Sequence, residues 1–481
     1  MKKHLLCASF FVMMPCIAHV HPGVQESKTF MWTRPVFFNN AAEQSAWHDF
    51  IYNKPSKGGS TVQIKSMYQK SLSKERIKQY FLFGCNNELL VAGDNSNCVK
   101  NRDVRAEWLG IQNDQFSGKL TINPEQRQVG FSITAHKDIS NLFDISFLQD
   151  YWVSIELPVF AVTNRLNLEQ YDVHNTAATE PNDIISAFNQ KKWLYAKMPK
   201  ERSALNAVGL LFKFGRAFLS EDHYQIAYYS IVNVPFGGGQ NAEYLFDAYA
   251  GTNQHVGFGN GVTFQILLNQ DATKYAFCWF LNLEHLFLIH NKQMRTFDLI
   301  GKPWSRYMLY NKKDGAPNLL EPGVNIFTYK CRVRPYNFVE FSTGWRIISE
   351  KYECEFGYDL WGHGDERVKV LCHVDESYGI AGSNTGSIPT SASQSTIGNQ
   401  ADNDEDENGD PLFVPVRFSD IDITSAEGQS AINHRMHASY AYLHKGESVD
   451  GFITIGGSLE FPQKNTALHV WTVWFKVGTA M

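Results

Sequence analysis

Charged side chains alternate with apolar ones along several stretches of the sequence. In residues 352–360, Glu353, Glu355 and Asp359 share one set of alternate positions, and mostly apolar residues take the other. Successive side chains of a β-strand point to opposite faces, so these three carboxylates would share a face. Opposed charges facing each other across water bind and select ions, as in channel walls. The pattern therefore indicates a polar interior with walls of mixed charge.

The same alternation selects further residues for this polar, pore-lining face. The candidates are Lys213, Gln225, Asn233, Gln265, Asn282, Glu284, Lys330, Arg332, Arg334, Glu340, Arg346, Glu353, Glu355, Asp359, Glu460 and Lys476. Opposite charges on neighbouring strands would then face one another across a lumen. The alternative is that these charges pair with one another and merely fill a closed interior.

Catalytic and metal-binding patterns are missing from the sequence. No Ser/His/Asp order, paired-carboxylate spacing or zinc pattern stands out. His285 and His290 lie five positions apart, which places them on opposite faces of a strand, so they are not presumed to share a ligand. We therefore predict a protein that is not an enzyme, with no cofactor and no metal site.

The elements that would position the charges are long strands separated by turn residues. The last of them, 470–478, places Trp471, Val473 and Phe475 on one face and Thr472 and Lys476 on the other. Most segments approach the 9 to 11 residues that a tilted strand needs to cross a bilayer. With weaker candidates near 104–109 and 327–334, the count is about 14 strands, in a range of 12 to 16.

The composition and the N-terminus favour an exported membrane protein. Met1, Lys2 and Lys3 precede an apolar stretch at 5–17, and cleavage after Ala18 would remove residues 1–18 as a signal peptide. Aromatic residues make up 14% of the chain, yet the mean hydropathy is only −0.30. A transmembrane β-barrel reconciles the two, because only alternate residues face lipid. The net charge of −5 argues against a nucleic-acid partner.

The predicted fold is all-β: one transmembrane antiparallel barrel at 58–481, with short helical insertions in its loops. Residues 19–57 would form an N-terminal lead-in or a plug-like segment, and long loops are expected at 169–202 and 372–412. A soluble β-sandwich would also alternate, but its core would not tolerate so many charges. In an oxidising envelope Cys85 and Cys98 could form a disulfide, although the sequence does not fix the pairing.

Four stretches resemble a known family: 297–308 (FDLIGKPWSRYM), 244–255 (YLFDAYAGTNQH), 356–361 (FGYDLW) and 471–478 (WTVWFKVG). They are similar to the porin-like outer-membrane β-barrel proteins of Dependentiae-type host-dependent bacteria, over residues 28–481. The resemblance implies an outer-membrane barrel and supplies no catalytic residue. The chain departs from it by ending on Met481 rather than Phe. Within the first stretch, Trp304 and Arg306 could fold inward as a constriction or anchor the outside of the barrel.

Two functions follow as leading expectations. The first is a channel for passive diffusion of small hydrophilic solutes across the bacterial outer membrane. The second is a plugged barrel that acts as a host-contact or adhesin surface protein. A third reading, a secreted carbohydrate-binding sandwich, is the soluble alternative. The expected partners are outer-membrane lipid, small hydrophilic solutes and the barrel-assembly machinery, and a homo-oligomer remains open.

Overall fold

The chain forms a closed antiparallel β-barrel. The computed structural model describes residues 27–47, 59–72, 75–83, 87–98, 101–139, 150–175, 179–221, 223–269, 275–313, 320–380, 415–446 and 449–480. Twelve strands close the barrel, and β8 joins the same sheet as an extra strand. In order around the barrel they are β1 (Ser60–Ser71), β25 (Val470–Ala480), β24 (Asp450–Pro462), β23 (Ala431–His444), β19 (Tyr352–His363), β18 (Tyr336–Ser349), β12 (Tyr275–Leu288), β11 (Gly257–Leu267), β10 (Tyr224–Pro235), β9 (Gly209–Glu221), β6 (Tyr151–Arg165) and β5 (Glu125–Asp138).

The first and last strands seal the barrel. β1 pairs antiparallel with β25, from Thr61 opposite Ala480 to Ser71 opposite Val470, and its other edge pairs with β5. The extra strand β8 (Arg202–Ala207) continues the line of β9, since both pair with β6 on the same side. A single sealed cylinder has no open edge, which excludes the soluble sandwich and confirms the predicted all-β barrel.

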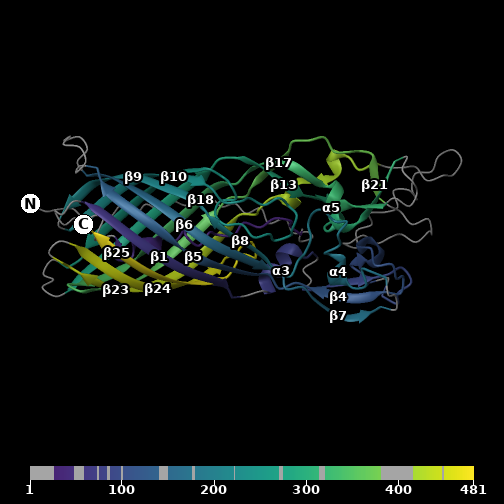
Figure 1. Cartoon of the computed structure of the whole chain (residues 1–481), viewed down its shortest axis with the longest axis horizontal. Helices are drawn as coiled ribbons and strands as arrows, with labels where there is room; N and C mark the ends of the chain where they lie inside the picture. Colours follow the sequence, from purple (N-terminus) through teal and green to yellow (C-terminus); the bar gives the residue numbers. More distant parts are fainter. Residues whose placement is uncertain are drawn as a thin grey trace, which may run out of the picture.

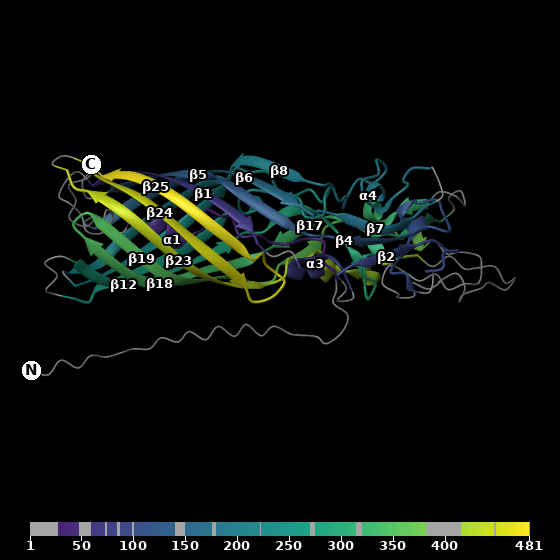
Figure 2. The same cartoon turned by 90° about the horizontal axis from the view of Figure 1, so that it is seen from below.

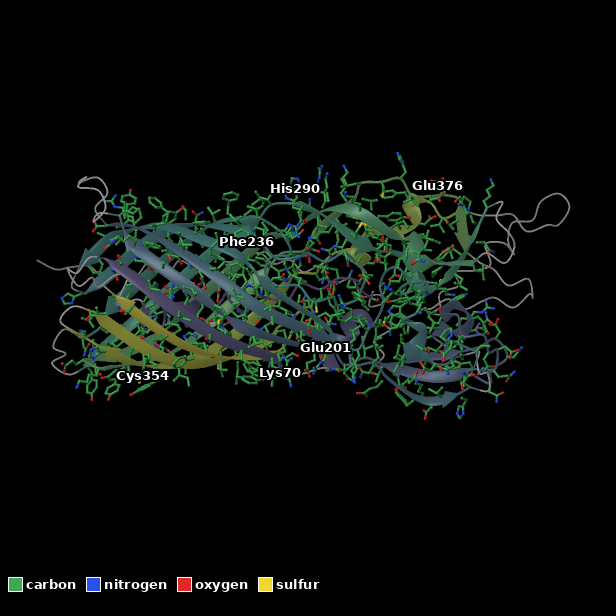
Figure 3. All side chains as sticks on the ribbon, in the orientation of Figure 1. Lys70, Glu201, Phe236, His290, Cys354 and Glu376 are labelled. Atoms are coloured by element: carbon green, nitrogen blue, oxygen red, sulfur yellow. The ribbon has the colours of Figure 1, made fainter. Side chains whose placement is uncertain are left out.

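The outer surface of the barrel is apolar. Its exposed side chains include Ile64, Phe131, Phe356, Ile455 and Phe475, all of which alternate with buried neighbours. Cys354 also lies on this outer surface, whereas Lys70, Glu201 and His290 lie where the barrel meets the rest of the molecule (Figure 3). A sealed cylinder with an apolar belt is built to face lipid, so the chain is an outer-membrane barrel. Among the described residues, no helix is both long enough and apolar enough to span a bilayer.

Long connections gather at one end of the barrel and fold into a second region beyond that end, which we call the head (Figures 1 and 2). The head consists of the described parts of 72–124, 166–201, 236–256, 289–335 and 364–430. The connections at the other end are shorter, from two residues at 350–351 between β18 and β19 to twelve at 139–150 between β5 and β6. The C-terminus lies at the short-turn end (Figure 1).

Small sheets and short helices build the head around its own apolar core. The strands are β2 (Leu89–Ala92), β3 (Val104–Arg105), β4 (Ser117–Thr121), β7 (Glu169–His174), β13 (Asn291–Thr296), β14 (Asp298–Leu299), β15 (Leu309–Lys312), β16 (Leu320–Pro322), β17 (Thr328–Arg334), β20 (Arg367–Val370), β21 (Tyr378–Ile380) and β22 (Ile421–Asp422). The helices are α3 (Glu75–Phe81), α4 (Ile184–Ala187) and α5 (Gly323–Ile326), with 3-10 turns η2 (Ala106–Leu109), η4 (Ser305–Tyr307), η5 (Phe418–Asp420) and η6 (Ile423–Ala426). The core includes Phe81, Phe188, Trp193, Trp304 and Tyr307, all buried.

The head accounts for the main differences from the sequence prediction. The weaker strand candidates near 104–109 and 327–334 belong to the head, which leaves twelve barrel strands, at the lower bound of the predicted range. Long loops were predicted only at 169–202 and 372–412. The connections at 72–124, 236–256 and 289–335 are long as well. Residues 1–18, predicted as a signal peptide, and most of 372–412 lie outside the described residues.

Candidate functional site: the barrel lumen and the segment inside it

The inward faces of the barrel strands carry the polar side chains that alternation selected. Most of the candidates are buried inside the barrel: Lys213, Gln225, Asn233, Gln265, Asn282, Glu340, Arg346, Glu353, Glu355, Asp359, Glu460 and Lys476. Glu284 joins them, with its carboxylate 2.8 Å from the Lys213 ammonium. Because buried charges are costly unless paired, each should have a partner within reach.

Lys330, Arg332 and Arg334 do not line the lumen, which corrects the prediction. They lie on β17, in the head, where their side chains are exposed, while the alternate Cys331 and Val333 are fully buried. The alternation was real, but its apolar side faces the head core and its charged side faces water.

A chain of paired charges crosses β18, β19 and β23 on the lumen wall. Arg346 binds Glu355, whose carboxylate lies 3.2 Å from the His437 ring. That ring is 2.8 Å from Asp359, which lies 2.7 Å from Arg435. Arg435 also binds Glu340. Basic and acidic side chains alternate along this chain, so they stabilise one another in the buried interior of the barrel.

The N-terminal segment 27–47 lies inside the barrel. It starts in the head, where the Lys28 amide donates to Tyr80 O at 2.9 Å, and it ends at Trp47, which packs against Phe452. Phe452 lies opposite Gly478, near the C-terminal end of β25. The segment therefore runs along the lumen from the head end towards the short-turn end.

Within the lumen the segment forms the short helix α1 (Asn40–Gln44). Asn39 caps its first turn, with the side-chain oxygen accepting from the Ala42 amide at 3.1 Å. The last carbonyl groups of such a helix have no partner of their own. Here they accept from the wall, since Lys476 donates to Glu43 O and Ser45 O at 2.8 and 2.6 Å. Cations at this end also complement the helix dipole.

Other wall residues bind the main chain of the segment. Gln128 on β5 accepts from the Val36 amide at 3.1 Å and donates to Arg34 O at 2.9 Å. The Asn40 amide donates to Glu340 at 3.1 Å, and the Ala46 amide donates to Glu353 at 2.8 Å. These contacts come from strands on opposite sides of the barrel, so the wall holds the segment from several directions.

Two side chains of the segment form ion pairs with the wall. Arg34 binds Glu460 on β24, with both side chains 3% exposed. Glu43 binds Lys213 on β9 at 2.7 Å. Apolar contacts add to these pairs, because Val36 and Phe37 pack in one buried cluster with wall residues such as Trp474.

A small cavity lies beside the segment. A cavity of ≈ 20 Å³ lies between Phe38 and the wall, lined also by Glu284, Glu340, Phe338 and Trp361. This volume is about that of one water molecule. Around Phe38 the segment and the wall are therefore closely packed.

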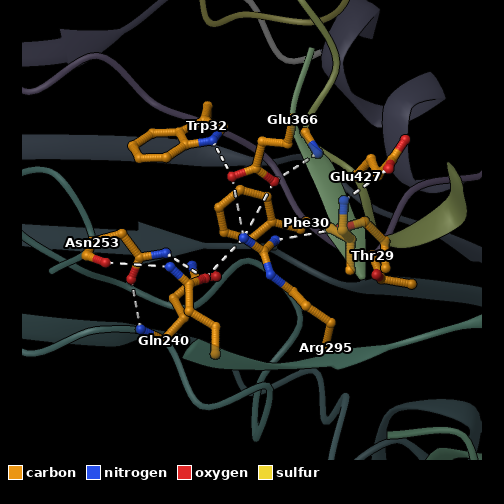
Figure 4. Close-up of polar contacts among 12 residues, drawn as sticks. Thr29, Phe30, Trp32, Gln240, Asn253, Arg295, Glu366 and Glu427 are labelled. Atoms are coloured by element: carbon orange, nitrogen blue, oxygen red, sulfur yellow. Dashed lines mark hydrogen bonds and ion pairs between the residues drawn. The ribbon is translucent and has the colours of Figure 1, made fainter. Parts of the chain in front are cut away.

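Trp32 and Phe30 of the segment contact Glu366 and Arg295 of the head connections (Figure 4). The Trp32 indole donates to Glu366, and the Arg295 guanidinium lies 3.2 Å from the same carboxylate. Arg295 also stacks 3.3 Å from the centre of the Phe30 ring, a cation–π contact. Burial raises the pKa of Glu366 and lowers the pKa of Arg295, and their mutual attraction opposes both shifts.

Trp304 and Arg306 lie in neither of the predicted places. Both are fully buried in the head core, at η4. The Trp304 indole donates to Phe81 O at 2.8 Å, and Arg306 pairs with Asp298, whose pKa is raised by burial. They form neither a lumen constriction nor an anchor on the outside of the barrel.

The predicted disulfide lies outside the described part of the chain, because Cys85 does. Cys98 is half-buried in the head. Within the described ranges, no group of three or more His, Cys, Asp or Glu side chains is placed to hold a metal ion.

Several lumen residues escaped the sequence prediction. Lys65 shares the inward face of β1 with Gln63, and this alternation was available in the sequence. Arg435 and His437 were ambiguous, because polar His434 lies on the opposite face of β23. Arg34 had no signal at all, since its segment has no period of two.

Comparisons with known proteins find likenesses in architecture only. No family model matches the chain, and no curated protein does. Among solved structures, an outer membrane channel from Pseudomonas putida F1 has a TM-score of 0.37 at 8% identity, over 89% of this chain and 97% of that one. The NanC porin has a TM-score of 0.26 at 6% identity, over 87% and 98%. A Pseudomonas aeruginosa FadL homologue has a TM-score of 0.26 at 8% identity, over 87% and 88%. Similarity this low does not decide the function.

Proposed function

We propose that this protein is an outer-membrane channel for small hydrophilic solutes, and that its N-terminal segment closes the lumen in this structure. The observation that carries the proposal is the charged wall behind the segment. Replacing buried ion pairs by packed apolar residues is often neutral or stabilising. A lumen that served only as a filled core would be equally stable with apolar residues in place of Arg346, Glu355, Asp359 and Arg435. Charged side chains at these positions are suited instead to a wall that contacts water when the channel opens.

The size of the lumen supports the same proposal. Barrels of about 8 strands are filled by their own side chains, whereas those of 16 to 18 strands hold open water channels. This twelve-stranded barrel holds a helix and its flanking residues in addition to the wall side chains. Movement of the segment would vacate a path lined by charges of both signs.

The direct test is to delete residues 27–47 from the full chain and record currents in planar bilayers. We expect long-lived conductance steps from the deletion variant and rare, short openings from the wild type. Retention of the heat-modifiable band on gels serves as the control for assembly. An assembled deletion variant that stays silent in several preparations would rule out the channel.

The head favours a second candidate function, host contact. It has its own buried core at the end of the barrel opposite the C-terminus. If the protein is an adhesin, deletion of residues 381–412 should abolish attachment to host cells and leave solute uptake unchanged. The reverse result favours the channel.

A further inference from the structure

We propose that the lumen is a binding site for short peptides. In this structure the N-terminal segment, which belongs to the same chain, occupies the site in place of such a peptide. This inference names a solute class and so rests on the proposed channel. The argument concerns which atoms of the segment the wall recognises.

The first observation is the double contact made by Gln128. Its side-chain oxygen accepts from the Val36 amide, and its side-chain nitrogen donates to Arg34 O. One carboxamide thus satisfies an N–H and a C=O of the same stretch of chain, as a neighbouring strand would. Every residue except proline offers both groups, so this contact is available to any peptide.

The second observation is that the sign of each wall charge suits the main-chain group that it contacts. The carboxylates of Glu340 and Glu353 accept from amides, at Asn40 and Ala46. The cations of Lys476 and Arg346 donate to carbonyl groups, at Glu43, Gln44 and Ser45. Charge-assisted hydrogen bonds are the stronger kind, and here they are directed at groups that all peptides share.

The third observation is that three buried polar side-chain atoms near the helix of the segment have no partner on the described part of the wall. Within the described residues, Asn40 Nδ2, Gln44 Oε1 and Ser45 Oγ are buried without a hydrogen-bond partner. Any buried main chain must be hydrogen-bonded, so the main-chain contacts alone would be expected of a plain plug. A wall shaped for this one sequence would also satisfy its side chains. A wall shaped for peptides in general would leave such atoms unsatisfied, as these three are.

The two ion pairs of the segment fit the same ligand. Glu460 holds the cation of Arg34, and Lys213 holds the carboxylate of Glu43. A free peptide carries one ammonium and one carboxylate at its ends. The wall offers a partner to each.

The test uses the full chain lacking residues 27–47, with tetraalanine as the probe and a polyethylene glycol of equal mass as the comparison. We expect tetraalanine to block the current reversibly and to bind by calorimetry, and we expect the polymer to do neither. Gln128→Leu should weaken tetraalanine binding about tenfold, because two hydrogen bonds are lost. Gln63→Leu is the matched control: Gln63 is a buried lumen glutamine whose side-chain atoms have no hydrogen-bond partner in the described residues.

The outcomes separate the two proposals. A variant that conducts but does not bind tetraalanine overturns the peptide site and leaves the channel standing. A variant that binds tetraalanine but never conducts supports the site and overturns the channel. Binding of a synthetic peptide of residues 33–47 without binding of tetraalanine overturns the inference, because the wall would then be specific for its own segment. If the deletion variant does not assemble, a protease site placed within 48–58 allows the segment to be cut and washed out after folding.

Discussion

Arg34 shows at the scale of one residue how the segment is held. Its guanidinium binds Glu460 and Gln69 on the wall and also donates to Phe38 O within the segment. Glu460 in turn accepts from Asn433. The arginine thus links two points of the segment and also neutralises a wall carboxylate.

Arg34→Met should release the segment. Breaking a buried ion pair leaves the partner charge uncompensated and costs about 3–5 kcal/mol, so the open population should rise more than about 100-fold. The open fraction of single-channel recordings measures this. The double variant Arg34→Met/Glu460→Gln should recover much of the loss, because no unpaired charge remains. An unchanged open fraction in Arg34→Met would show that this pair does not hold the channel closed.

His255 gives the region between barrel and head a pH dependence. Its Nδ1–H donates to Ile289 O at 2.7 Å, and its Nε2 accepts from Gln293 at 2.9 Å, so a second proton on the ring would face a donor. Burial lowers the pKa of His255 to about 4, and Arg295 and His290 act in the same direction. The unfolded chain then takes up a proton below about pH 6.5, whereas the folded chain does not until about pH 4.

Acidification should therefore loosen this region. The contribution of neutral His255 to the free energy of unfolding is complete above pH 6.5. It falls by about 3 kcal/mol in all as the pH decreases towards 4. Hydrogen exchange of the Ile289 amide, corrected for its intrinsic pH dependence, should show falling protection between pH 7 and pH 5. His255→Gln should flatten this profile, and His373→Gln, at an exposed histidine of the head, should leave it unchanged. Equal profiles for wild type and His255→Gln would contradict the assignment.

At the scale of elements, β17 and β19 explain why sequence reasoning succeeded for the barrel and failed for the head. Both strands alternate charged and apolar residues. In β19 the apolar side faces lipid and Glu355 faces the lumen, whereas in β17 Val333 faces a protein core and Arg332 faces water. Period two fixes which residues share a face, but not which solvent that face meets. The twelve long strands were therefore predictable, and the head was not.

The sequence predicted that residues 19–57 form either a lead-in or a plug-like segment, and it did not predict the contacts of that segment. A plug-like lead-in follows from where residues 19–57 stand in the chain, but the contacts that hold it depend on strands far away in sequence, such as β5 and β25. Trp304 was misplaced for a related reason. An aromatic residue beside a cation is equally at home in a lumen, at a membrane interface or in a core.

The head should unfold separately from the barrel, because it has its own core. Trp304→Ala removes a fully buried ring and its hydrogen bond to Phe81 O, which should cost about 3–5 kcal/mol. Limited proteolysis should then cut the head while the heat-modifiable barrel band persists. Ile300→Ala is the matched control, since Ile300 is 59% exposed in the same connection. Loss of the barrel band together with the head would show one cooperative unit.

At the scale of the whole molecule, the two ends of the barrel differ in kind. Long connections form the head at one end, and short turns such as 350–351 close the other, where the C-terminus lies. Outer-membrane barrels typically have short periplasmic turns and longer extracellular loops. The head would then face the outside, and the segment would pass from the head down towards the periplasm.

This orientation decides what the head can contact. An epitope tag inserted after Glu376, which is exposed in the head (Figure 3), should bind antibody on intact cells. A tag after Glu350, in the short turn between β18 and β19, should bind only after the cells are permeabilised. The opposite labelling would place the head in the periplasm. Host contact through the head would then be excluded. Opening of the channel would have to be controlled from the periplasm.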